Sequence, residues 1–293
     1  MTDSSPTSGL VVVDKAAGMT SHDVVARVRR LAGTRKVGHA GTLDPMATGV
    51  LVLGVNRATR LLGHLMLTEK AYDATIRLGV ATTTDDAEGE TTATVSTDHV
   101  AETTVRAALA VQVGEIEQVP SAVSAIKVDG RRAYDRVRAG EQVELAARRV
   151  TVHAIDVTDV RRGAGTVDVD VSVRCSSGTY VRAIARDAGA ALGVGGHLTS
   201  LRRTAVGPFT LEAAHTLDEL AESFALVPIA EAARACFPSY DLAEEQAADV
   251  RVGRRLDLVV AEYGPVAVFA PDGGFLALYE RRGPQAAPVA VFV

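Results

Sequence analysis

Four valines in strict alternation with polar residues place the strongest constraint on the fold. They occupy the segment 166–174, at positions Val167, Val169, Val171 and Val173. Because successive side chains of a β-strand point to opposite faces, this pattern predicts a strand with one buried face and one polar face. The chain is therefore expected to contain a sheet that packs on one side.

Other segments predict that helices accompany this sheet. Further strands are expected at residues 10–13, 50–55, 72–78, 114–118 and 150–157, where β-branched and apolar residues gather. Thr20 and Asp23 are nearly a capping box, and the apolar residues that follow recur at helical spacing until Gly33. A second helix is expected at about 180–192, and weaker patterns suggest helices at 102–110 and 132–138. The pattern favours a mixed α and β fold.

The sequence pattern changes at about residue 238. Short β-like runs follow at 256–260, 266–269, 275–278 and 289–293, separated by glycine and proline signals such as Asp272-Gly273. We therefore expect three parts: a disordered polar tail at 1–8, a large domain at 9–237 and a small β domain at 238–293.

Length and composition indicate a soluble globular protein. The chain has 293 residues, of which 47% are hydrophobic and 23% charged. Its longest apolar runs are far shorter than the about 20 residues of a membrane helix, and its first residues lack the features of an export signal, so a cytoplasmic location is expected. Cys175 and Cys236 lie in separate contexts without zinc-type spacing and are expected to be small core residues.

The distribution of charge is uneven. The formal net charge of -5 argues at first against a nucleic-acid partner, because phosphate binding depends on Lys and Arg. Between residues 27 and 60, however, a single acid, Asp44, stands among seven basic residues: Arg27, Arg29, Arg30, Arg35, Lys36, Arg57 and Arg60. The sequence permits a basic face on an acidic body, while ordinary solvated surface charge is the alternative.

A glycine-rich loop at residues 38–45 contains that single acid. Asp44 precedes Pro45, which disfavours the α region and keeps the aspartate outside a helix. An Asp-Pro turn is the ordinary alternative. Nearby cations are expected to lower the pKa of Asp44 and keep it ionised, which suits a nucleophile better than a general acid.

Residues 38–49, GHAGTLDPMATG, resemble the signature of the bacterial tRNA pseudouridine-55 synthases, the TruB family. Other segments match the same family in order and approximate spacing: Asp14-Lys15 with Gly18, residues 58–60, 70–72, 118–121, 177–182 and 201–203. The resemblance implies an α+β catalytic domain with a mixed, mainly antiparallel sheet flanked by helices. It also implies a small C-terminal β-barrel-like domain of the PUA type, which binds RNA.

The resemblance also implies an activity and three catalytic residues. The expected reaction converts uridine to pseudouridine at position 55 in the TΨC loop of tRNA. Asp44 would attack the target uridine, either at C6 of the base or at C1′ of the ribose, and the sequence leaves both routes open. Tyr72 would stack on the base, and Arg182 would pair with Asp44 and orient it. An ordinary strand tyrosine and a surface arginine are the alternatives.

A further set of residues is expected to hold the RNA. Because the target base lies inside a folded loop, the enzyme must extrude it. The resemblance implies that His39 helps to hold the flipped arrangement, that Tyr180 contacts the base or sugar and that Leu201 forms an apolar wall. Phosphate contacts are expected from Lys15, Arg57, Arg60, Arg202 and Arg203. A structural histidine, core residues and surface arginines are the corresponding alternatives.

The remaining expectations concern mobility and partners. The basic segment at about 122–149 corresponds to a family insertion that closes on the RNA. The reaction is an isomerisation, so no cofactor is expected, and the sequence shows no metal-binding pattern. The resemblance suggests a monomer without an obligate protein partner.

Two other functions are compatible with parts of the pattern. One is a non-catalytic RNA-binding protein or tRNA-folding chaperone on the same fold, which would not need Asp44. The other is a phosphate-binding enzyme that uses the glycine-rich loop. That loop lacks the Gly-x4-Gly-Lys-Ser/Thr spacing of a P-loop, so the second alternative is poorly supported.

Overall fold

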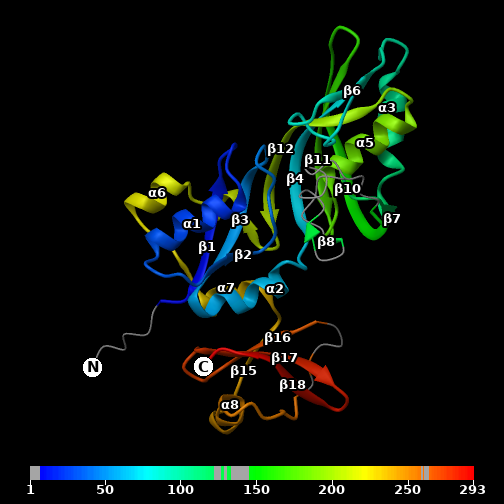
Figure 1. Cartoon of the computed structure of the whole chain (residues 1–293). Coiled ribbons are helices and arrows are strands. Elements are labelled where there is room, and N and C mark those ends of the chain that lie inside the picture. The colour runs from blue at the N-terminus through cyan, green and yellow to red at the C-terminus, as the bar shows by residue number, and fades with distance from the viewer. Residues whose placement is uncertain (1–6, 122–126, 129–130, 133–144, 259, 261–263) are drawn as a thin grey trace.

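A large sheet flanked by helices and a smaller C-terminal sheet make up the protein (Figure 1). The computed structural model describes residues 7–121, 127–128, 131–132, 145–258, 260 and 264–293. No helix within these ranges is long and apolar enough to cross a membrane. The expected α+β class is confirmed.

The large sheet is mixed but mainly antiparallel, as predicted. Its strands follow the order β14-β1-β3-β12-β4-β11-β10-β7, with β2 paired to β3 and β13 paired to β12. One junction in this order, between β3 and β12, is parallel and has two register pairs, Arg202 with Thr48 and Arg203 with Gly49. The strands are β1 (Gly9–Lys15), β2 (Val37–His39), β3 (Thr48–Val55), β4 (Lys70–Leu78), β7 (Gly114–Gln118), β10 (Arg148–Arg162), β11 (Val167–Cys175), β12 (Gly196–Val206), β13 (Phe209–Thr210) and β14 (Val227–Pro228).

Helices pack on one face of this sheet and, at β1 and β3, on both faces. The capping box of the first helix is present: Thr20 accepts a hydrogen bond from the backbone of Asp23, whose side chain accepts one from the backbone of Thr20. Two short hairpins, β5 (Val80–Thr82) with β6 (Thr91–Thr94) and β8 (Lys127–Val128) with β9 (Arg131–Arg132), lie outside the sheet. The helices are α1 (Ser21–Leu31), η1 (Asn56–Leu61), α2 (Leu62–Leu65), α3 (Glu102–Ala110), α5 (Val181–Ala191), η2 (Leu211–Ala213), α6 (Leu217–Glu222) and α7 (Ile229–Cys236).

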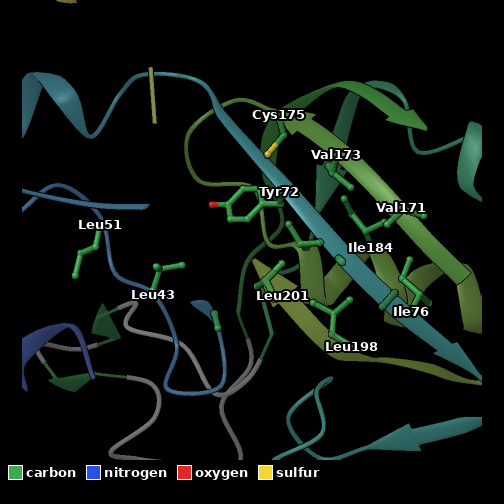
Figure 2. Packing of buried hydrophobic residues seen from close by; sticks show 14 of the residues in the cluster. Leu43, Leu51, Tyr72, Ile76, Val171, Val173, Cys175, Ile184, Leu198 and Leu201 are labelled. Atoms are coloured by element: carbon green, nitrogen blue, oxygen red, sulfur yellow. The ribbon is translucent and has the colours of Figure 1, made fainter. Parts of the chain in front are cut away.

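The alternating valines lie in β11 as the pattern predicted. Each is at most 2% exposed, and they share one core with Ile184 of α5 and Leu198 of β12 (Figure 2). On the opposite face, Asp168 accepts two hydrogen bonds from Arg77 of β4, each at 2.7 Å. The strand therefore divides an apolar core from a polar surface.

The C-terminal unit is a four-stranded sheet with one helix. Its elements are β15 (Ser239–Asp241), α8 (Glu244–Arg251), β16 (Val266–Phe269), β17 (Phe275–Arg282) and β18 (Gln285–Val291). Phe269, Phe275 and Phe292 pack in one core with residues of β1, β3 and α7. Arg57 donates a hydrogen bond to the carbonyl of Phe292 at 3.1 Å, and Arg60 to that of Val291 at 2.7 Å.

Several predicted boundaries need correction. The described part of the strand expected at 256–260 is not a strand, because Leu256 makes only an isolated bridge to Ala286; residue 259 lies outside the described residues. The last strand begins earlier than expected. Arg132 lies in β9, and the rest of the helix predicted at 132–138 falls outside the described residues. Thr7 and Ser8, assigned to the tail, accept hydrogen bonds from Asn56 and from Arg57.

Candidate active site

A cavity of about 260 Å³ opens beside the β3/β12 junction. Its volume lies near the lower end of the roughly 300–1,000 Å³ range of ligand pockets. The loop before β3, the first residues of β4, the turn into α5 and the middle of β12 all line it. Six of the predicted site residues meet there: Asp44, Tyr72, Tyr180, Arg182, Leu201 and Arg203.

A buried arginine joins two carboxylates at this cavity. Nη2 of Arg182 lies 3.0 Å from Oδ2 of Asp44, and Nη1 lies 3.1 Å from Oδ2 of Asp86. Nη1 also donates to the carbonyl of Thr84 at 2.9 Å. The side chains of Arg182 and Asp86 are 4% and 3% exposed, whereas that of Asp44 is 36% exposed and faces the cavity. The predicted pairing of Arg182 with Asp44 is present, and sequence reasoning missed Asp86.

The prediction that the pKa of Asp44 is lowered was wrong, because the structure raises it. Burial raises the pKa of Asp44 above its usual range, and this effect exceeds the opposing effect of the Arg182 guanidinium. The negative charge of Asp86 raises the pKa further. The sequence showed the basic neighbours of Asp44 but not the partial desolvation of its carboxyl group in the cavity.

Lys15 fixes the loop that carries Asp44. Its side chain is fully buried, and Nζ donates to the carbonyls of Pro45 at 3.2 Å, Met19 at 2.8 Å and Ala16 at 2.9 Å. Burial lowers the pKa of Lys15 to about 8. An ammonium group in this position does not reach a phosphate at the surface, so the structure replaces the predicted phosphate contact with a role in holding the loop.

Two more buried side chains hold the same loop. Ser21 Oγ accepts a hydrogen bond from the Leu43 amide at 2.9 Å and donates to the Leu43 carbonyl at 3.1 Å. Arg203, which is 1% exposed, donates to the carbonyls of Gly41 and Thr42, each at 3.3 Å. Arg203 is therefore also unavailable for the predicted phosphate contact, and the loop is held from β12 as well as from α1.

Tyr72 and Leu201 form apolar walls of the cavity. Both are less than 10% exposed, and they lie on the adjacent strands β4 and β12. Figure 2 shows the ring of Tyr72 projecting from β4 toward the side on which Leu43 and Leu51 lie. Burial raises the pKa of Tyr72, so its phenol remains neutral at physiological pH.

The backbone of Tyr180 is held by a carboxamide. Gln118 Oε1 accepts from the Tyr180 amide at 2.8 Å, and Gln118 Nε2 donates to the Tyr180 carbonyl at 3.1 Å. Gln118 is 2% exposed, so water competes little for these bonds. This contact fixes the residue that precedes α5, two positions before Arg182. Sequence reasoning had matched Gln118 to the family without assigning it a role.

Five predicted site residues lie outside the cavity lining: Lys15, His39, Arg57, Arg60 and Arg202. His39 ends β2, and its ring centroid lies 5.7 Å from that of His22 in an edge-on arrangement. Arg60 bonds to the C-terminal strand, as described above. Arg202 pairs with Asp14, with Nη2 2.6 Å from Oδ2.

The cavity offers charged and aromatic groups. Within the ranges that the structure describes, no three His, Cys, Asp or Glu side chains come together as ligands for a metal ion. The groups at the cavity are a carboxylate, two guanidinium groups, the ammonium group of Lys70 and two phenols.

Solved structures share this fold over nearly the whole chain. A Cbf5-Nop10-Gar1 complex matches with a TM-score of 0.74 and 27% identity, covering 97% of this chain and 85% of that one. An H/ACA ribonucleoprotein bound to a substrate RNA containing 2′-deoxyuridine matches with a TM-score of 0.73 and 25% identity, with the same coverage.

Family models and full-length relatives identify the family of this chain. Residues 29–181 match the N-terminal domain of the TruB family of pseudouridylate synthases, residues 182–234 match a tRNA pseudouridylate synthase B C-terminal domain, and residues 237–293 match the C-terminal model of tRNA pseudouridine synthase II. Fold and site thus define a pseudouridine synthase. Among such enzymes, the chain belongs to the TruB family.

Bacterial relatives resemble the chain from end to end. The protein named tRNA pseudouridine synthase B of Thermobifida fusca (strain YX) is 61% identical over 288 residues, covering 97% of this chain and 98% of the relative. The protein of the same name from Streptomyces griseus subsp. griseus is 57% identical over 298 residues, covering both chains completely.

Proposed function

We propose that this enzyme converts uridine to pseudouridine at position 55, in the TΨC loop of tRNA, with Asp44 as the attacking carboxylate. The observation that carries the proposal is the ion pair between Asp44 and the buried Arg182 at the opening of the cavity. The relatives that span the whole chain bear the name tRNA pseudouridine synthase B, which supports tRNA as the substrate.

The reaction exchanges one bond for another within the nucleotide. The bond from N1 of uracil to C1′ of ribose breaks, the base turns, and a new bond joins C5 to C1′. The hydrogen at C5 leaves as a proton, and N1 gains a proton, so the sum of atoms and electrons is unchanged. Asp44 would start the sequence by attacking C6 of the base or C1′ of the ribose. Both routes need an ionised carboxylate beside the base, which Arg182 favours.

The walls of the cavity suit an extruded base. Removing a base from its stack costs a few kcal/mol, which contacts with the enzyme must offset. The aromatic face of Tyr72 offers stacking of roughly 1–3 kcal/mol, and Leu201 on the adjacent strand adds apolar surface that excludes water. Tyr180, fixed by Gln118, would contact the base or sugar, and His39 would support the flipped arrangement from outside the lining.

Outside the cavity, we assign RNA binding to two further parts of the chain. Residues 238–293 would act as a PUA-like domain on the large domain at 9–237, with exposed arginines such as Arg255, Arg281 and Arg282 near phosphates. The closing insertion at about 122–149 falls mostly outside the described residues and remains a prediction.

Release of tritium from a tRNA transcript that contains [5-³H]uridine tests the proposal. Wild-type enzyme should release tritium to solvent, and Asp44→Asn should abolish release while RNA binding persists. Asp73→Asn is the matched control, because Asp73 accepts a hydrogen bond from Ser172 on the polar face of the sheet. It should retain turnover.

Each outcome has a distinct meaning. Release that is lost only in Asp44→Asn, followed by mapping of pseudouridine to position 55, would support the proposal. Tight, salt-sensitive binding without release from any tRNA would favour a tRNA-folding chaperone instead. Release that survives Asp44→Asn would remove Asp44 from the chemistry.

A further inference from the structure

The outer face of α1 and the turn after it carry cations that the cavity does not use. We call them the basic strip: Arg27, Arg30, Arg35 and Lys36. All four residues are exposed. Among the residues that the structure describes, none of their side chains forms a hydrogen bond or an ion pair. The strip is therefore a surface of uncompensated positive charge on a chain whose net charge is -5.

The other cations of the same basic segment are already engaged. Arg57 and Arg60 donate to carbonyls of the C-terminal strand region, and Arg29 donates to the Val37 carbonyl at 3.2 Å. On the polar face of the sheet, Arg77 pairs with Asp168 and Arg161 pairs with Asp170. Among the described residues, single cations such as Arg174 and Arg255 also lack such partners, and the strip stands apart because four of them lie within ten residues of the chain.

The strip begins at the active-site loop. Ser21, the first residue of α1, is hydrogen-bonded in both directions to Leu43, the neighbour of Asp44. From there the 11 residues of α1 extend for about 16 Å, at 1.5 Å per residue. A strip of this length can span several successive phosphates of a nucleic-acid backbone.

A second cavity lies at the far end of the strip. It has a volume of about 700 Å³, and Arg35 and Lys36 line it together with Thr34, Asn56 and Phe224. Phe224 is 36% exposed, which leaves aromatic surface accessible. Cations beside an aromatic side chain form the combination that binds nucleotides without reading their sequence.

Local structure explains only part of the strip. Arg30 lies in the last turn of α1, where a cation interacts favourably with the helix dipole. Helix α6 packs near α1 and carries Asp218, Glu219 and Glu222, but Glu219 is engaged in its own capping box with Thr216. The positions of Arg27, Arg35 and Lys36 have no equivalent explanation.

We propose that the basic strip binds the phosphate backbone of the substrate tRNA outside the hairpin whose loop enters the active site. This inference rests on the proposed function, since it assumes the same RNA. The hairpin loop occupies the cavity beside Asp44, and the strip leads away from that cavity. It therefore offers the rest of the tRNA a contact that an isolated hairpin does not reach.

A triple variant tests the strip: Arg27→Gln, Arg30→Gln and Arg35→Gln. The matched control, Arg106→Gln with Arg161→Gln and Arg162→Gln, removes the same charge from the α3 and β10 end of the molecule. Binding of a full tRNA transcript and of the isolated TΨC hairpin is measured over a range of salt concentrations, and thermal unfolding verifies that both variants are folded.

The expected result is specific to the full tRNA. Loss of three phosphate contacts should raise its Kd on the order of tenfold and reduce the salt slope by up to about 2.7. The Kd of the hairpin should not change, and the control variant should bind both RNAs as the wild type does. Equal weakening of hairpin and tRNA would overturn the proposal by placing the strip on the hairpin itself. No weakening of either RNA would identify the strip as solvated surface.

The proposed function is judged separately in the same experiment. Tritium release from the hairpin by wild-type enzyme reports on the reaction, whereas the difference in Kd between the two RNAs reports on the strip. Absence of release would contradict the reaction and leave the comparison of Kd values interpretable.

Discussion

Asp44 and Asp86 share one guanidinium group, that of Arg182, at 3.0 Å and 3.1 Å. The second carboxylate has two opposing effects. It anchors Arg182 and thereby orients Asp44, yet its negative charge raises the pKa of Asp44. The geometry of Asp44 and its ionisation therefore depend on the same neighbour.

The substitution Asp86→Asn should separate these effects. The rate should fall by roughly 10–100-fold, as expected when an orienting partner is removed. The pKa of Asp44 should decrease, because a like charge is lost. Since the proposed reaction needs the ionised carboxylate of Asp44, the acid limb of the rate profile should move to lower pH. Single-turnover rates from acidic to neutral pH measure both changes.

Asp85→Asn is the control for this prediction. Asp85 is the adjacent residue and pairs with Arg186 at 3.3 Å, not with Arg182. The Asp85→Asn variant should leave the acid limb of the pH–rate profile close to its wild-type position. Movement of the limb to higher pH in Asp86→Asn would contradict the assignment.

Removal of the Gln118 carboxamide should impair catalysis more than RNA binding. Gln118→Ala leaves the amide and carbonyl of Tyr180 without their buried partner, which should destabilise the fold by about 1–3 kcal/mol and lower kcat roughly tenfold. Gln112→Ala is the matched control, because Gln112 is also buried and donates to a carbonyl of α5, that of Ile184, at 3.0 Å. Denaturant melts should show a similar loss of unfolding free energy for both variants, and only Gln118→Ala should have a lower kcat.

The arginines that contact the C-terminal strand region should act on stability. Substituting both Arg57→Gln and Arg60→Gln removes two charged donors, each worth about 1.5–3 kcal/mol at most. The double variant should unfold at a lower temperature, measured by circular dichroism. Arg254→Gln breaks an exposed pair with Asp249 and should cost no more than about 1 kcal/mol. An equal effect of the two changes would argue against docking by Arg57 and Arg60.

Gly49 should tolerate no side chain. Its φ is +97°, and a Cβ atom there would lie 2.2 Å from the carbonyl oxygen of Arg203 on the neighbouring strand. Gly49→Ala should therefore destabilise the protein by more than the roughly 1–2 kcal/mol of left-handed backbone alone. Gly33→Ala provides that reference, because Gly33 has a φ of +60° and no atom within 4 Å of the added carbon. Thermal melts of the two variants give the comparison.

The sequence correctly predicted those elements whose pattern involves only residues close together in the chain. The alternation of β11 and the capping box of α1 each depend on residues close in sequence, and both are present. Strand β12 escaped prediction because two bulges, between Leu198 and Ser200 and between Arg203 and Ala205, interrupt its alternation. Helix α8 buries only Ala247 and Val250, so it lacks a strong apolar stripe.

The site was predicted as a set of residues and not as an electrostatic environment. The resemblance brought together Asp44, Tyr72 and Arg182, which line one cavity. The roles of Lys15 and Arg203 could not be predicted, because their partners are backbone carbonyls that only the folded chain brings within reach. The raised pKa of Asp44 likewise depends on how much solvent surrounds the folded loop.

The parallel junction between β3 and β12 divides the reactive groups between two stretches of chain. The carboxylate of Asp44 comes from residues before β3, and the ring of Tyr72 and the guanidinium group of Arg182 come from residues between β3 and β12. A polypeptide cut in the exposed turn at Leu67 would yield two fragments, neither of which contains a whole site. Turnover by such a split enzyme would therefore depend on the concentration of both pieces, and complementation of the fragments would report on assembly of the sheet.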